Sequence, residues 1–234
     1  MTSAEGSLNV ITKDVPKELI RYLGPSIQWL EVDSGGWGNY RPDDKRKGDG
    51  PVAEIIRHIQ DWIDATRNRR VCIQAGGNLG LYPKVYSNFF DKVITFEPDK
   101  ISYNVLLTNT KAVPNISSFN KALSNINGWA TLNIHNRVNN GTHTIVGVED
   151  TYNEANAASV PTTTIDSLNL EYLDLLHLDV EGHESYILEG ALNTILKCKP
   201  TIILEANNCG DFLSKLGYIN KGKYQDNVFV PGEI

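Results

Sequence analysis

From Arg70 onward the chain alternates short apolar runs with amphipathic segments, and this alternation constrains the fold more than any other feature. Apolar runs of strand length predict buried strands, and apolar residues three or four positions apart predict helices. The predicted strands are Val71–Ala75, Lys92–Glu97, Ile116–Leu123, Leu175–Asp179 and Thr201–Glu205. The predicted helices are Gly80–Phe90, Ile101–Thr110, Glu184–Leu196 and Cys209–Leu216. Strands that alternate with helices form a mostly parallel sheet with both faces covered, so the expected class is a doubly wound, Rossmann-like α/β fold.

The alternation is interrupted once, at about residues 128–161. Period-two patterns occur there, joined by turns of which Asn140-Gly141 is the clearest hairpin signal. The β segments of this interruption are Trp129–His135, His143–Val148 and Val160–Ile165. A β insertion is therefore expected inside the main domain. At the end of the chain, Tyr218–Ile219 and Asn227–Val230 predict a last antiparallel pair.

Residues 1–69 are predicted to be an N-terminal helical extension of a domain that spans residues 70–234. A first helix is expected at Glu18–Leu23, ended by Gly24-Pro25. Pro51 opens a second helix whose apolar residues recur at helical spacing, so this helix should pack on the sheet. Between them, the glycine-rich loop 33–50 carries Trp37 and Tyr40, which either pack locally or cover a ligand.

Composition and charge narrow the functional classes. The 234 residues are enough for one sizeable α/β domain. A net charge of −6 argues against a protein that grips nucleic acid through its phosphates, and no apolar run approaches the ~20 residues of a membrane span. The three cysteines form no CxxC pair, which favours reduced thiols and a cytoplasmic protein. We expect neither a membrane nor nucleic acid as a partner, and the sequence leaves the oligomeric state open.

Ligands of such sheets bind at the carboxyl ends of the strands, and the first strand ends in a glycine-rich turn, Gln74–Gly80. Its glycines allow close approach of the backbone, and the helix start that follows suits a carboxylate or a phosphate. Glu97 ends the next strand about 20 residues further on, where a carboxylate can hold the two hydroxyls of a ribose. For the glycine turn, the alternatives are a plain tight turn or a dinucleotide site. For Glu97, the alternative is a surface residue before the turn-forming Pro98-Asp99.

Several motifs follow one another in order between about residues 70 and 218. They are Val71–Gly80, Phe96–Asp99, Asn120–Ser124, Val160–Asp166, His177–Glu184, Leu188–Ala191 and Pro200–Glu205. As an ordered set they resemble the FkbM-type methyltransferases, and the block Asp179-Val180-Glu181-Gly182 is the most specific part. The resemblance implies a class I methyltransferase fold, S-adenosylmethionine as the methyl donor and usually a hydroxyl as the acceptor.

The resemblance also implies which residues meet the donor. The glycine turn would take its methionine end, Glu97 its ribose, and the segment 120–122 would border its adenine. The expected cofactor-binding residues are Gln74, Gly76, Gly77, Asn78, Gly80, Glu97, Pro98, Asp99, Asn120, Ala122 and Asp179. Two positions depart from the family pattern: Gln74 replaces the usual Asp, and His177 replaces the usual Lys. An uncharged amide at Gln74 is expected to attract the cationic donor less strongly.

Methyl transfer requires an acceptor oxygen held against the methyl group and a group that takes its proton. Asp179 ends a central strand and is the first candidate for a base or an acceptor orienter. The other candidate catalytic residues at this edge are Glu181, His183 and Glu205. The alternative for this block is a turn in which Glu181 or Glu184 caps the next helix.

Oxygen ligands at the strand ends also bear on metal binding. Asp179, Glu205 and Asn207 together would suit Mg²⁺ or Ca²⁺. A divalent metal is nevertheless not favoured, because carboxylates at strand ends often serve structure or substrate. His135 and His143, in the β insertion, are predicted to be surface histidines, since neither has a companion at metal-ligand spacing.

The leading hypothesis is an S-adenosylmethionine-dependent O-methyltransferase acting on a hydroxyl of a sugar or another polar small molecule. The β insertion and loop 33–50 are rich in Asn, Thr and Gly, which suits hydrogen bonds to such an acceptor. One alternative is a nicotinamide-dependent oxidoreductase, which shares the glycine turn and the acidic residue but lacks the Asp-Val-Glu-Gly block. A second is a catalytically inactive module that binds adenosyl ligands, with Gln74 as its support.

Overall fold

The computed structural model describes residues 59–135, 140–146, 154–205, 209–224 and 226–232, together with two short strands nearer the N-terminus. Loop 33–50 with Trp37 and Tyr40, and also Asn207, lie outside the described residues. Within the described part, no helix is both long and apolar enough to cross a lipid bilayer.

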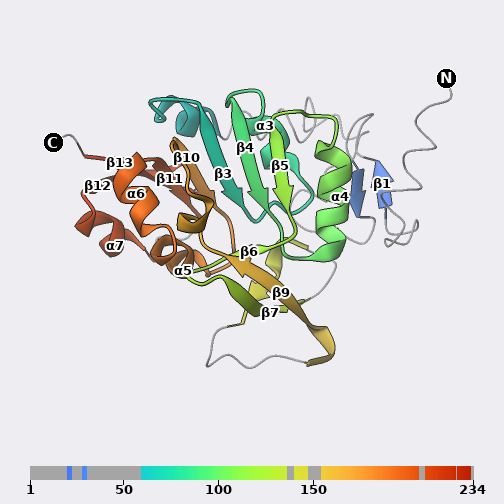
Figure 1. The fold of residues 1–234 in the computed structure, drawn as a ribbon. Coiled ribbons are helices and arrows are strands. Elements are labelled where there is room, and N and C mark those ends of the chain that lie inside the picture. The colour runs from blue at the N-terminus through green and yellow to red at the C-terminus, as the bar shows by residue number, and fades with distance from the viewer. Residues whose placement is uncertain are drawn as a thin grey trace, which may run out of the picture.

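A seven-stranded sheet forms the centre of the molecule, in the order β12-β13-β11-β10-β3-β4-β5 (Figure 1). Its strands are β3 (Val71–Ala75), β4 (Lys92–Phe96), β5 (Ile116–Phe119), β10 (Leu175–Leu178), β11 (Thr201–Leu204), β12 (Tyr218–Tyr224) and β13 (Asp226–Pro231). Every pairing is parallel except those of β13, which runs antiparallel to both of its neighbours. The predicted doubly wound α/β sheet and its final antiparallel pair are confirmed.

The first strand of this sheet in chain order, β3, lies inside the sheet and not at an edge. The chain moves outward from β3 through β4 to β5, and later returns to β10 on the other side of β3. The strand order therefore reverses between β3 and β10, and the loops that leave these two strands diverge. A crevice at the carboxyl ends of β3 and β10 is the place where sheets of this kind bind ligands.

Alternation along the strands divides the apolar core into two layers. One layer packs on the helical residues 59–64, α3 (Leu81–Tyr86) and α4 (Lys100–Thr110). The other packs on α5 (Glu184–Glu189), α6 (Leu192–Cys198) and α7 (Gly210–Lys215). Neighbouring strand residues point to opposite layers: Cys72, Leu175, Ile203 and Val228 to the first, and Ile73, Leu176, Ile202 and Phe229 to the second. Because Trp62 is fully buried in the first layer, the helix before residue 70 is part of the core.

The N-terminal prediction of a helix at Glu18–Leu23 is wrong. Residues Ile20–Tyr22 form strand β1, which pairs antiparallel with β2 (Gln28–Leu30). So short a segment makes too few helical hydrogen bonds to offset the cost of nucleating a helix, and Gly24-Pro25 prevents its extension. The backbone groups of the two strands instead pair with each other. Strand β2 packs beside α4 (Figure 1).

The predicted β insertion forms a separate four-stranded sheet in the order β6-β9-β7-β8. Its strands are β6 (Ala122–Leu123), β7 (Gly128–Asn133), β8 (Thr144–Ile145) and β9 (Ala157–Thr163). Asn140-Gly141 lies in a 3-10 turn between β7 and β8. In Figure 1 the arrowheads of β3, β4 and β5 point toward this second sheet, so the insertion stands at the carboxyl edge of the central one.

The predicted strand Ile116–Leu123 is interrupted at Asn120 and Lys121, so that β5 stays in the central sheet while β6 joins the insertion. The side-chain Nδ2 of Asn120 donates to the carbonyl oxygens of Glu97 (2.9 Å) and Pro98 (3.0 Å). These two bonds tie the interruption to the end of β4, and the chain then turns away from the central sheet.

The predicted helices at Gly80–Phe90 and Glu184–Leu196 are also shorter than expected. The first ends at Tyr86, and the second breaks into α5 and α6 at Gly190. A Cβ atom on Gly190 would lie 2.2 Å from the backbone oxygen of Ser124, so the break lets the chain meet the start of the insertion. Asp166 then accepts hydrogen bonds from the backbone N–H groups of the first residues of α6, which stabilises the new helix start.

Gly76 brings the ends of β3 and β10 together. Its φ is +78°, and a Cβ atom there would lie 1.7 Å from the backbone oxygen of Asp179. The backbone N–H of Asp179 also donates to the carbonyl oxygen of Ala75 (3.2 Å). The absence of a side chain at Gly76 therefore sets the distance between the glycine turn and the loop that carries Asp179.

We expect Gly76→Ala to destabilise the fold more than Gly182→Ala, although both glycines have positive φ. Nothing lies within 4 Å of a Cβ atom on Gly182, so that change carries only the backbone cost of about 1–2 kcal/mol. Gly76→Ala adds a clash with Asp179, worth about 1–3 kcal/mol more. Urea unfolding of both variants measures the difference, and equal free energies of unfolding would show that the clash is relieved without cost.

Candidate functional site

A cavity opens at the carboxyl edge of the sheet, between the ends of β3, β4 and β10 and the β insertion. Of the residues predicted from sequence, those that line the cavity are Gly76, Asn78, Glu97, Pro98, Ala122, Asp179, Glu181 and His183. The other lining residues are Ala75, Phe96, Lys121, Leu123, Leu132, Gly141, His143, Ile145 and Val180.

Glu97 stands at the end of β4 and joins two walls of the cavity. Its Oε2 accepts a hydrogen bond from the backbone N–H of Asn78 (2.7 Å), and its Oε1 accepts one from the backbone N–H of Asp99 (2.8 Å). A carboxylate has about four lone-pair positions, and these two bonds hold the group in one orientation. Glu97 is therefore a rigid acceptor that can also take hydroxyl groups of a ligand.

Asn78 offers a second acceptor to the cavity. Its backbone has a positive φ of 44°, which an Asn tolerates better than most residues. Its side-chain Oδ1 is buried and has no hydrogen-bond partner among the described residues. Because buried polar atoms are almost always paired, this oxygen calls for an N–H or O–H group from a ligand or a water molecule.

Gln74 lies behind the glycine turn and does not line the cavity. Its side chain is fully buried on β3. The Nε2 donates to the carbonyl oxygens of Ala75 (3.0 Å) and Gly76 (2.9 Å), and the Oε1 accepts from the hydroxyl of Thr95 (2.8 Å). The amide thus holds the turn in place from within, and a charged Asp would not supply the two donors.

The remaining predicted cofactor residues lie behind the residues that line the cavity. Asp99 caps α4 by accepting a hydrogen bond from the backbone N–H of Ser102 (2.9 Å). Gly77 donates its N–H to the carbonyl oxygen of Phe96 (2.9 Å), and Gly80, at φ +88°, leads the turn into α3. Asn120 ties the ends of β4 and β5. Like Asp99, Gly77 and Gly80, it does not line the cavity.

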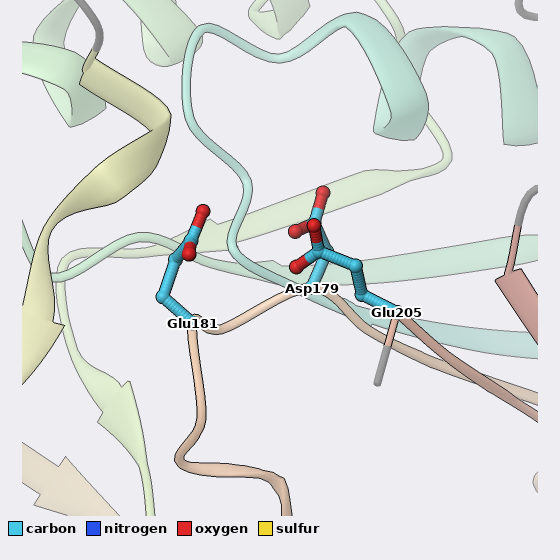
Figure 2. Close-up of side chains that lie close together, drawn as sticks. All are labelled: Asp179, Glu181 and Glu205. Atoms are coloured by element: carbon cyan, nitrogen blue, oxygen red, sulfur yellow. The ribbon is translucent and has the colours of Figure 1, made fainter. Parts of the chain in front are cut away.

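Three carboxylates gather where β10 and β11 end. Asp179 follows β10, Glu181 comes two residues later at a positive φ of 53°, and Glu205 follows β11. Each offers an oxygen, and these three oxygens lie within 4.8 Å of one another. In Figure 2 Asp179 and Glu205 stand side by side, with Glu181 beyond them on the same loop as Asp179. We call these three residues the acid cluster. Asn207, which was considered as a third oxygen ligand beside Asp179 and Glu205 but was not favoured, lies outside the described residues.

A family model described as the methyltransferase FkbM domain matches residues 78–221, more than half of the chain. The chain belongs to the FkbM methyltransferase family. No curated protein matches the sequence.

Several solved methyltransferase structures are similar to parts of this chain, at low sequence identity. An FkbM methyltransferase from Methylobacillus flagellatus KT is 16% identical, with a TM-score of 0.45 over 69% of this chain and 43% of that one. A putative RNA methyltransferase from Pyrococcus horikoshii is 11% identical, with a TM-score of 0.42 over 78% and 83% of the two chains. A precorrin-6y C5,15-methyltransferase from Geobacter metallireducens GS-15 is 10% identical, with a TM-score of 0.39 over 73% and 85%.

In this FkbM family member, burial and repulsion from neighbouring carboxylates hold protons on Asp179 and Glu181. Burial is the main reason that the pKa of Asp179 lies well above its usual value, and the charges of Glu205, Asp226 and Glu181 raise it further. Burial also raises the pKa of Glu181 to about 7, with Glu205 and Glu184 adding to the effect. A carboxyl group that releases its proton near neutral pH, as Glu181 does, is suited to proton transfer or to binding a cationic ligand.

His183 stays neutral at physiological pH, because burial lowers its pKa to about 4. Its Nε2 lies 3.1 Å from the hydroxyl of Ser124, at the start of the insertion, and its ring stacks on Tyr186. His183 therefore lines the cavity as a neutral hydrogen-bonding group that connects the loop after β10 with the insertion.

His143 is the site residue that sequence reasoning missed. The prediction of a surface histidine holds for His135, which is exposed, but is wrong for His143, which lines the cavity with both ring nitrogens buried. Leu132 and Ile145 line it as well, and they are directly opposite each other on β7 and β8. Spacing along the chain carries no signal for these contacts, because they depend on how the insertion folds back over the sheet.

His177 lies on β10 in the buried core, two residues before Asp179. Its Nδ1 is 3.0 Å from the hydroxyl of Tyr86, and its Nε2 is 3.8 Å from Oδ2 of Asp226. Burial lowers the pKa of His177 to about 3, so the imidazole is neutral. The family's usual Lys is thus replaced by an uncharged group enclosed by Trp62 and Tyr82.

The raised pKa of Glu181 makes stability depend on pH. Folded Glu181 holds a proton up to about pH 7, whereas the unfolded chain releases it near 4.5. The folded state therefore binds more protons between these values, and its stability falls as the pH rises through that window. We expect Glu181→Gln to become progressively more stable than the parent from pH 4.5 to pH 7, as measured by urea unfolding. A constant difference across that range would contradict the raised pKa.

Proposed function

We propose that this protein is an S-adenosylmethionine-dependent methyltransferase that methylates a hydroxyl oxygen of a sugar or another polar small molecule. The observation that carries the proposal is the cavity itself, in which the rigid acceptor Glu97 meets Asp179 and Glu181 at the reversal point of an FkbM-family sheet. The proposed partner is a small molecule or a saccharide, with no role for a membrane or nucleic acid, and the proposed location is the cytoplasm.

The residues that line the cavity fit the donor group by group. Glu97 can accept the ribose hydroxyls, and the unpaired Oδ1 of Asn78 can accept from the donor's ammonium group. Ala122, Leu132 and Ile145 provide an apolar wall for a flat adenine ring. When bound, S-adenosylmethionine supplies an electrophilic methyl group on a cationic sulfonium, and the carboxylates of the cavity complement that positive charge.

The acid cluster supplies the groups that an acceptor hydroxyl needs. Asp179 faces the cavity from the end of a rigid strand, so its carboxyl group can orient the hydroxyl and take its proton. A positive donor beside Asp179 and Glu181 favours their ionised forms and lowers their pKa values toward the working pH. His183, with a pKa of about 4, is a weak base and is assigned a hydrogen-bonding role.

The rival functions have less support. The family match favours methyl transfer over a nicotinamide-dependent oxidoreductase. Gln74 offers no support for an inactive module, because its amide is engaged within the protein and does not face the cavity. Donor binding and transfer can therefore be tested separately, as follows.

Calorimetric titration of the purified protein with S-adenosylhomocysteine, S-adenosylmethionine and NADH should give saturable binding of the two adenosyl compounds alone. Glu97→Gln should weaken S-adenosylhomocysteine at least tenfold, since a hydrogen bond to a charged group is worth about 1.5–3 kcal/mol. Glu171→Gln, an exposed change before β10 at the opposite edge of the sheet, is the control. Unchanged affinity in folded Glu97→Gln would refute the ribose assignment, and binding of NADH alone would favour the oxidoreductase.

Asp179→Asn keeps the shape of the side chain but removes its ability to take a proton. We expect the rate of methyl transfer to a polyhydroxylated acceptor to fall about 10²–10⁴-fold. The affinity for S-adenosylhomocysteine should stay within about tenfold of the parent value, because one acceptor–donor contact is altered. Transfer assays with radiolabelled S-adenosylmethionine measure the rate, and an unchanged rate would remove Asp179 from the chemistry.

A further inference from the structure

One side of α5 lies against the start of the β insertion. His183 precedes the helix, and Tyr186 and Glu189 follow at intervals of three residues, which places all three on the same side. The ring of His183 stacks on that of Tyr186, with 4.8 Å between the ring centroids and 21° between the planes. Gly190 comes next, and a Cβ atom there would lie 2.2 Å from the backbone oxygen of Ser124. The helix and the loop at Ser124 are therefore in close contact.

Three hydrogen bonds connect this side of α5 with the loop. The Nδ2 of Asn125 donates to Oε2 of Glu189 (3.1 Å), and the hydroxyl of Ser124 donates to Oδ1 of Asn125 (3.4 Å). The same hydroxyl oxygen lies 3.1 Å from Nε2 of His183. We call Glu189, Asn125, Ser124 and His183 the His183 network. It runs from an exposed carboxylate to a ring that lines the cavity.

The direction of each bond follows from what its atoms can donate. A carboxylate only accepts, so the amide of Asn125 turns its NH₂ group toward Glu189 and its oxygen toward Ser124. A serine has one hydroxyl hydrogen, and the bond to Asn125 uses it. The oxygen of Ser124 is then the acceptor in its contact with His183. The network therefore places the ring hydrogen of His183 on Nε2.

The other ring nitrogen of His183 is left with a lone pair. Burial lowers the pKa of His183 to about 4, and a neutral imidazole carries a single ring hydrogen. With that hydrogen on Nε2, Nδ1 can only accept. Within the described part of the structure Nδ1 makes no hydrogen bond, and it is not closed off from solvent. Because His183 lines the cavity, a ligand held there can donate a hydrogen bond to Nδ1.

We propose that the other three residues of the His183 network are positioning residues that keep the ring hydrogen on Nε2, and that Nδ1 of His183 selects the acceptor by accepting a hydrogen bond from one of its hydroxyl groups. Asp179 takes the proton of the hydroxyl that is methylated, whereas His183 holds a second hydroxyl whose O–H bond stays intact. The acceptor class that fits is a molecule with at least two hydroxyl groups, such as a monosaccharide. This acceptor role rests on the proposed methyltransferase function, but the position of the ring hydrogen does not.

Long-range ¹H–¹⁵N NMR correlation of the full chain, labelled with ¹⁵N in histidine, measures the tautomer at neutral pH without donor or acceptor. His183→Gln identifies the signals of His183. In the parent we expect a pyrrole-type shift for Nε2 and a pyridine-type shift for Nδ1. Asn125→Ala frees the hydrogen of Ser124 to bond Nε2, so the tautomer with hydrogen on Nδ1 should become populated. Asn125→Asp again offers Ser124 an acceptor oxygen and should restore the parent tautomer. Asn68→Ala, at an exposed residue before β3, is the control.

Methyl transfer from radiolabelled S-adenosylmethionine to glucose, galactose and mannose tests the acceptor role. For each of these sugars that is methylated, we expect Asn125→Ala to lower kcat/KM about three- to tenfold, the worth of one hydrogen bond between neutral groups. The loss should appear mainly as a higher KM, because the bond to the second hydroxyl forms before the reaction and persists through it. Asn125→Asp should recover the parent value, and Asn68→Ala should not change it.

The two measurements separate the parts of the proposal. A ring hydrogen on Nδ1 in the parent, or the same tautomer in the parent and in Asn125→Ala, would overturn the His183 network even where a sugar is methylated. The expected tautomers together with an unchanged kcat/KM in Asn125→Ala would overturn the acceptor role alone. The expected tautomers without methylation of any of the three sugars would support the network and count against the proposed methylation of a sugar, together with the acceptor role that rests on it.

Discussion

The close contact between Gly76 and the backbone of Asp179 is the constraint on which the site depends. Parallel strands β3 and β10 are neighbours, but their loops leave in different directions, and only a glycine lets the two backbones touch at that point. The contact places the glycine turn and the acid-bearing loop on the same side of the cavity. A side chain of any size at position 76 would separate the part of the site suited to the donor from the part suited to the acceptor.

Polar side chains inside the sheet edge keep this arrangement rigid. Gln74 fixes the glycine turn through its amide, and Asn120 ties the ends of β4 and β5. Glu97 spans the turn and the start of α4 with both of its oxygens. Because each of these groups is paired with backbone, the walls of the cavity are set before a ligand arrives, which reduces the ordering that binding requires.

Sequence patterns predicted what depends on local periodicity. The strands of the central sheet, their parallel arrangement and the β insertion follow from apolar spacing that repeats along the chain. The errors have two causes. The segment that forms the strand Ile20–Tyr22 is too short to nucleate a helix, and the helix break at Gly190 is set by a distant contact, the backbone of Ser124. For the same reason motifs found Glu97 and Asp179, whereas the place of His143 depends on the fold of the insertion. Likewise, the inward orientation of Gln74 depends on Thr95, a partner on the next strand.

The cross-strand pair of Leu132 and Ile145 gives the insertion a thermodynamic link to whatever fills the cavity. These side chains close one wall, so a ligand packed against them contacts the second sheet as well as the first. A ligand that binds only the folded insertion adds RT ln(1 + [L]/Kd) to its stability. Binding in the cavity would then slow the hydrogen exchange of the backbone amides that pair β7 with β8 and β9, although these amides lie away from the reacting groups.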